Sequence, residues 1–389
     1  MKVTCSDATV YNKEKKSFVK GVDMTAITVS SLISPKIDSS NYHILPGFAD
    51  VHVHFREPGF SYKETIKTGS RAAAHGGYTT VCTMPNLNPT PDSLENLGLQ
   101  LDIIKRDSVI RTIPFGTITK GQNGKELSDI EAMAPFVCGY SDDGKGVDDT
   151  GLMREAMLRA KALGKIISAH CEDGTQIKDS PAAEWKEIER DIKLADETGV
   201  KFHVCHISTK ESVSLIRDAK KSGVDITCET GPHYLLFSRL HEKDDGRFRF
   251  NPPLREEEDR LALVEGLTDG TVDMIATDHA PHSMEEKSKG LGSLNGIVGL
   301  ETAFPVMYTE FVKKGVITLE KLTELMGVAP YERFGFEPNG FTVYDLNNEY
   351  VIDPAEFESM GRCTPFDGRC VFGRCMATVA DGEIVYIAN

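Results

Sequence analysis

Short runs of β-branched and apolar residues recur along the chain, and stretches with helical character separate them. Runs of this length and composition predict β-strands. They cover residues 43–55, 79–86, 111–118, 135–143, 165–173, 201–209, 225–237 and 272–281. Polar residues gather near the ends of these runs, whereas a plain packed core would be apolar throughout.

Most of the segments between the runs predict helices. Residues 63–77 are rich in alanine and end in a glycine pair, whereas residues 150–164 open with a Thr cap and residues 208–223 with a Ser cap, both ending in Gly. Residues 128–134 give the weakest helical pattern. Eight alternating strand and helix units predict a parallel (β/α)8 TIM barrel, in which the active site lies at the carboxyl ends of the strands.

The two ends of the chain do not continue this alternation. Residues 1–44 and 338–389 contain short stretches in which apolar and polar positions alternate, with turns between them. We expect both segments to combine into one small β-sandwich domain beside a barrel of residues 45–337.

Composition narrows the range of partners and compartments. The formal net charge of −15 argues against binding to nucleic acid or to an anionic membrane surface. Nine cysteines form no paired framework, and neither a secretory signal pattern nor a membrane-spanning apolar stretch is visible. We therefore expect a cytoplasmic protein. Because the chain is acidic overall, binding of an acidic substrate would require positively charged side chains at the binding site.

The residues at the strand ends suit a metal site. His52 and His54 are two positions apart on a predicted strand, so both side chains point to the same face. His170, His206 and Asp278 each stand near the end of a later run. Strand ends converge in a closed barrel, and nitrogen and oxygen ligands of this kind favour Zn²⁺.

Five segments of the chain closely resemble the dihydroorotases of the amidohydrolase superfamily. They are HVHFREPGFSYKETIKTG (52–69), AAAHGGYTTVCTMPN (72–86), SAHCED (168–173), ATDHAPHSMEEK (276–287) and NGIVGLETAF (295–304). The resemblance covers roughly residues 44–310 and continues weakly into the terminal segments. Hydantoinases and allantoinases share the H-x-H pair and the Asp, but they differ around REPG and MPN.

The resemblance implies a pair of metal ions, and we expect one or two Zn²⁺ per subunit, with two favoured. The implied ligands are His52, His54 and Asp278 for the first ion, and His170 and His206 for the second. Many members bridge the two ions with a carboxylated lysine, but this chain has YSDDG at the matching strand end. Asp143 is the better match for a bridging carboxylate, and Asp142 is the alternative.

The implied reaction opens and closes the six-membered ring of dihydroorotate, with Asp278 acting first as general base and then as general acid. The implied substrate-binding residues are His54, Arg56, Asn86, Asn251, His282, Asn295 and Gly296. The guanidinium of Arg56 matches the single carboxylate of dihydroorotate. Residues 282–296 are polar and rich in glycine, and we expect a mobile loop over the mouth of the site.

Two other functions are compatible with parts of this pattern. A hydantoinase or allantoinase would act on a related cyclic amide, and an inactive scaffold subunit would have lost metal ligands, all types of which are present here. We expect structural roles for His43, His75, His203 and His233. The resemblance further implies a homodimer, and an association with aspartate carbamoyltransferase is left open.

Overall fold

The computed structural model describes residues 2–27 and 42–388 of the chain. Each of the eight predicted runs overlaps a strand of the barrel. These strands are β4 (Phe48–Val53), β5 (Tyr78–Thr83), β6 (Arg111–Pro114), β7 (Gly139–Tyr140), β8 (Ile166–Ala169), β9 (Lys201–Val204), β10 (Ile226–Thr230) and β11 (Met274–Ile275). All pairings between neighbouring strands are parallel, as the prediction required.

The eight strands close into a ring. Hydrogen-bonded pairing joins β4 to β6 in one sheet and β7 to β11 in another. Two isolated parallel bridges connect these sheets, one between Gly116 and Tyr140 and one between Val53 and His279. The carboxyl ends of all eight strands therefore face one end of a closed barrel, where an active site is expected.

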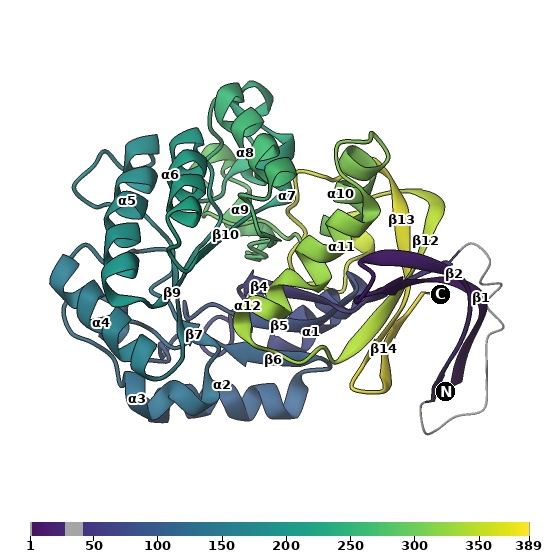
Figure 1. Cartoon of the computed structure of the whole chain (residues 1–389), viewed down its shortest axis with the longest axis horizontal. Helices are drawn as coiled ribbons and strands as arrows, with labels where there is room; N and C mark the ends of the chain where they lie inside the picture. The colour runs from purple at the N-terminus through teal and green to yellow at the C-terminus, as the bar shows by residue number, and fades with distance from the viewer. Residues whose placement is uncertain (1, 28–41, 389) are drawn as a thin grey trace.

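Helices cover the outside of the barrel (Figure 1). The α-helices of the described residues are α1 (Ile66–His75), α2 (Leu94–Asp107), α3 (Ile130–Met133), α4 (Thr150–Ala162), α5 (Pro181–Thr198), α6 (Lys210–Lys221), α7 (Pro232–Leu236), α8 (Glu257–Asp269), α9 (Met284–Lys287), α10 (Ala303–Met307), α11 (Leu319–Gly327) and α12 (Ala329–Phe334). Across the described ranges, none of them combines the length and the apolar character that a bilayer crossing requires.

Helix α4 illustrates how the sequence positions these helices. Its buried residues Met153, Ala156, Met157 and Ala160 follow the spacing of one helical face. The predicted caps of two helices are wrong by one residue. Asp149 caps α4 in place of Thr150, and Thr209 caps α6 in place of the serine before it, because these side chains reach the free amides of the first turn.

The terminal segments form one six-stranded mixed sheet instead of the predicted β-sandwich. Its strands are β1 (Lys2–Asn12), β2 (Ser17–Ile27), β3 (Tyr42–Pro46), β12 (Gly340–Val351), β13 (Cys370–Ala380) and β14 (Glu383–Ile387), in the order β14-β13-β12-β3-β1-β2. β3 pairs in parallel with β1 and antiparallel with β12. The two ends of the chain thus join edge to edge through β3 (Figure 1). Residues 28–41 of the predicted 1–44 segment lie outside the described residues.

The close approach of β7 and β8 can be tested with a glycine. A Cβ atom at Gly139 would lie 2.6 Å from the carbonyl oxygen of its register partner Ile166, whereas a Cβ atom at Gly98 in α2 would meet nothing within 4 Å. We expect Gly139→Ala to destabilise the fold by about 1–3 kcal/mol. The control Gly98→Ala should stabilise it by about 0.5–1 kcal/mol, since alanine favours a helix interior. Equal melting temperatures for the two variants would contradict the tight packing.

Candidate active site

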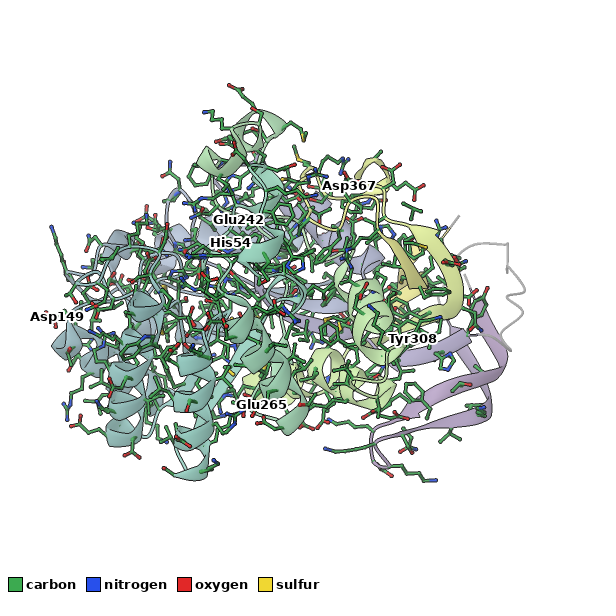
Figure 2. The ribbon with its side chains drawn as sticks, turned by 90° about the horizontal axis from the view of Figure 1, so that it is seen from above. His54, Asp149, Glu242, Glu265, Tyr308 and Asp367 are labelled. Atoms are coloured by element: carbon green, nitrogen blue, oxygen red, sulfur yellow. The ribbon has the colours of Figure 1, made fainter. Side chains whose placement is uncertain are left out.

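The predicted metal ligands all stand at the carboxyl ends of barrel strands. His52 lies on β4, and the others follow the ends of their strands within a few residues: His54, Asp143, His170, His206 and Asp278. All six are buried, and His54 lies well inside the outline of the molecule, whereas Asp149 lies at its edge (Figure 2). His206 and Asp278 adopt positive φ angles of 31° and 47°, which are strained for residues other than glycine and are common at functional sites.

His52, His54 and Asp278 form the first group of converging ligand atoms. Asp278 Oδ1 lies 3.1 Å from His54 Nε2 and 3.6 Å from His52 Nε2. Asp143 faces the same two rings, with Oδ1 3.4 Å from His52 Nε2 and Oδ2 3.5 Å from His54 Nε2. Four side chains from three strands thus meet at one point.

His170 and His206 form the second group. His170 Nδ1 lies 2.9 Å from His206 Nε2. Asp143 Oδ1 lies 3.7 Å and 3.5 Å from these two nitrogens, so a single carboxylate faces both groups.

Asp142, the alternative bridging residue, faces elsewhere. Its carboxylate accepts hydrogen bonds from the backbone amides of Ile118 and Thr119, at 2.8 and 3.1 Å, and from the Thr119 hydroxyl. Asp142 therefore anchors the segment after β6, whereas Asp143 faces both histidine groups.

Two observations indicate that this cluster fits divalent cations. His52 Nε2 and Asp143 Oδ1 are buried and face each other, yet neither has a hydrogen-bond partner. Unsatisfied buried polar atoms each cost about 1–3 kcal/mol. A tetrahedral zinc ion with ligands at about 2.0–2.2 Å places its ligand atoms roughly 3.4 Å apart. The spacings of 3.1–3.6 Å around His52 and His54 match that separation.

The charges of the cluster are mutually stabilised. Burial raises the pKa of the Asp143 carboxyl, but His52 and His206 outweigh burial and hold that pKa well below its usual range. The same competition lowers the pKa of Asp278, mainly through its contact with His54. Burial lowers the pKa of His54, whereas the carboxylates of Asp143 and Glu172 outweigh burial and raise the pKa of His52 and of His170 respectively. Ionised carboxylates and a neutral imidazole are the forms that bind metals.

Two carboxylates that the sequence analysis missed, Glu229 and Glu172, orient ligand histidines by binding their second ring nitrogens. His52 Nδ1 donates to Glu229 Oε1 at 2.7 Å, and His203 Nε2 donates to Glu229 Oε2 at 3.1 Å. His170 Nε2 donates to Glu172 at 3.2 Å. Histidines that bind metals usually donate their second ring N–H to such a carboxylate. The available signals were a glutamate inside the apolar run of β10 and a glutamate two residues after His170.

A cavity of about 190 Å³ opens beside the cluster. Its walls are His54, Arg56, Asn86, Asp143, Gly144, His170, His206, Asn251, Asp278, Ala280, Asn295 and Gly296. Every predicted substrate-binding residue except His282 lines this cavity. His282 lies directly behind the wall, where its Nε2 donates to the Asn295 carbonyl oxygen at 2.7 Å and lies 3.3 Å from Arg56 Nη2.

Three of the histidines that were predicted to be structural have hydrogen-bond or packing partners. His75 pairs with Glu301 at 2.6 Å, and His203 binds Glu229 and the hydroxyl of Thr227. His233 packs against Tyr234 and Phe250.

The predicted loop 282–296 borders the cavity through Asn295 and Gly296. The buried Lys287 donates to the carbonyl oxygens of Arg249 and Leu294 and ties this loop to its neighbour. Its expected mobility stays a prediction.

Known proteins resemble this chain over most of its length. A family model described as Dihydro-orotase-like matches residues 42–190. The dihydroorotase of Fusobacterium nucleatum is 49% identical over 380 residues, covering 90% of this chain and 89% of that protein. The dihydroorotase of Bacillus subtilis is 45% identical over 382 residues, covering 90% and 88%.

Solved structures share the fold. The L-hydantoinase (dihydropyrimidinase) of Arthrobacter aurescens superposes with a TM-score of 0.87 at 24% identity, covering 100% of this chain and 97% of that one. This likeness supports the TIM-barrel architecture alone, whereas the sequence relatives are close enough to assign a family. Together with the buried histidine and aspartate cluster, they show that the chain belongs to the dihydroorotase family of the amidohydrolase superfamily.

Proposed function

We propose that this chain reversibly hydrolyses the ring amide of (S)-dihydroorotate to N-carbamoyl-L-aspartate, as a step of pyrimidine (UMP) biosynthesis, with two zinc ions held by the strand-end cluster. The observation that carries the proposal is the position of Asp143. Its carboxylate lies within 3.7 Å of a ring nitrogen in each of the two histidine pairs. A side chain so placed can serve two neighbouring cations at once.

The ligands divide into two sets. His52, His54 and Asp278 would hold one ion, His170 and His206 the other, and Asp143 would contact both. When bound, the cations polarise the amide carbonyl and lower the pKa of water toward about 7. Glu229 and Glu172 fix the ring orientations of His52 and His170, which would present their other nitrogens to the cations.

Asp278 would carry the proton between the two halves of the reaction. Its side chain lines the cavity, and one oxygen contacts His54 at 3.1 Å. The carboxylate accepts a proton from the attacking water and then delivers it to the ring nitrogen that leaves the carbonyl carbon. In the direction of ring closure, Asp278 removes the same proton from the ureido nitrogen.

The carboxylate of the substrate would bind at the Arg56 side of the cavity. Arg56 Nε donates to the Pro281 carbonyl oxygen at 3.2 Å, which fixes the plane of the guanidinium. Asn86 is held by its bond to the Asp143 carbonyl oxygen at 2.7 Å. Together with Asn251, His282 and the backbone at Asn295 and Gly296, these groups would orient the ring.

Three further proposals rest on the family resemblance and on the composition. We propose that the chain forms a homodimer, that it is able to associate with aspartate carbamoyltransferase, and that it acts in the cytoplasm. Eight cysteines of the described residues carry free thiols, in keeping with a reducing compartment.

The purified wild-type protein tests the proposal directly. We expect about two zinc ions per chain by elemental analysis, and ring opening of dihydroorotate that is far faster than that of hydantoin or allantoin. Removal of metal by a chelator should abolish turnover, and added Zn²⁺ should restore it. Turnover of hydantoin or allantoin without turnover of dihydroorotate would assign the chain to the other branch.

The bridging role of Asp143 predicts a loss of metal. In Asp143→Ala the zinc content should fall below two per chain, and kcat should fall by more than about 100-fold. Asp102→Ala on the exposed face of α2 is the matched control and should keep both values. Two zinc ions and normal kcat in the Asp143 variant would rule out the bridge.

The proposed carboxylate contact predicts an effect on affinity. Arg56→Lys keeps the charge but loses the planar pair of donors, so KM for dihydroorotate should rise about tenfold while kcat changes less. Arg71→Lys, an exposed change on α1, should leave KM unaltered. An unchanged KM in the Arg56 variant would count against the contact.

A further inference from the structure

A buried lysine stands behind the proposed carboxylate site. Lys63 follows the REPG segment and is only 8% exposed. Its Nζ lies 3.1 Å from His282 Nδ1 and 3.0 Å from Glu286 Oε1. A buried ammonium group is costly unless its surroundings compensate it, so these contacts define where its three donors point.

The contact with Lys63 decides which nitrogen of His282 carries the proton. An ammonium group only donates, so His282 Nδ1 must accept and the ring proton must sit on Nε2. Nε2 indeed lies 2.7 Å from the Asn295 carbonyl oxygen, an acceptor. Burial, together with Arg56 and Lys63, lowers the pKa of His282 to about 3, so the ring is neutral.

The single ring N–H of His282 is therefore directed to the Asn295 carbonyl oxygen, in the cavity wall that also contains Arg56. Arg56 Nη2 and His282 Nε2 lie 3.3 Å apart, and neither can accept from the other. Asn295 and Gly296 line the same cavity as Arg56, so the bond from His282 sets the position of backbone that borders the proposed carboxylate site.

Glu286 would reverse this arrangement if the lysine were absent. Glu286 Oε2 lies 3.4 Å from His282 Nδ1. Its position is fixed by hydrogen bonds from the Ser283 backbone amide at 3.0 Å and from the Tyr62 hydroxyl at 3.2 Å. A carboxylate in this place draws the ring proton to Nδ1, which leaves Nε2 as an acceptor that repels other oxygen atoms.

We propose that Lys63 is a positioning residue: it keeps the ring proton of His282 on Nε2, so that this ring holds the backbone at Asn295 and Gly296 in place beside the proposed carboxylate site. Lys63 thereby sets the preference for cyclic amides that carry a carboxylate. The inference rests on the proposed function, because it concerns how the same site recognises its substrate. Lys63 acts through His282 and touches no reacting atom.

The test compares Lys63→Met with Lys67→Met, an exposed lysine four residues further along the chain. In zinc-loaded protein, Lys63→Met should raise KM for dihydroorotate by about tenfold or more, with a much smaller change in kcat. The inhibition constant of orotate, a planar analogue with the same carboxylate, should rise in parallel. Lys67→Met should match the wild type in both.

A second variant separates positioning from folding. In Lys63→Met/Glu286→Gln a neutral amide replaces the carboxylate that would draw the ring proton to Nδ1, so the Asn295 carbonyl oxygen again keeps that proton on Nε2. We expect this double variant to recover most of the KM and of the orotate affinity. Recovery would not follow if Lys63 only supported the fold.

Three results bear on the inference and on the proposed function separately. A normal KM in Lys63→Met, or a KM defect that Glu286→Gln does not relieve, would overturn the role of Lys63 while the function stands. A wild-type protein that holds zinc and does not open dihydroorotate would overturn the proposed function itself.

Discussion

Closure of the barrel is the constraint on which the site depends. Imidazoles and carboxylates are costly to bury singly, and they become tolerable only when strands distant in the sequence bring them within reach of one another. The bridges between Gly116 and Tyr140 and between Val53 and His279 complete the ring. Val53 stands between His52 and His54, so the same bridge that closes the barrel also fixes the first histidine pair beside Asp278.

The chain is acidic overall, but positive charge is concentrated on one side of the cavity. The chain carries a formal net charge of −15, and the cluster itself contributes several buried carboxylates. Arg56 and Lys63 supply local positive charge on one side of the cavity, separated by the neutral ring of His282. This distribution of charge supports the proposed orientation of a cyclic amide, with its anionic group at the cationic side and its amide near the histidines.

The sequence predicted the barrel and its inward polar residues because both leave local marks. Alternation of apolar runs with helical segments marks the strands, and the spacing of His52 and His54 marks a shared face. Pairing between distant segments leaves no such mark. The terminal sheet was wrongly predicted as a sandwich because alternation does not reveal which strand lies beside which.

Long-range partners also explain the residues that were missed. Glu229 binds a histidine 177 positions away, and Lys63 binds one 219 positions away. Identification of Asp143 required the family resemblance, since neighbouring Asp142 has the same chemistry. The placement of β3 between β1 and β12 also affects how the chain folds while it is being translated. The first three strands leave the ribosome long before residue 340, so one edge of β3 stays open until translation is nearly finished. A chain that stops early keeps this unpaired edge, which favours its aggregation or removal over its accumulation.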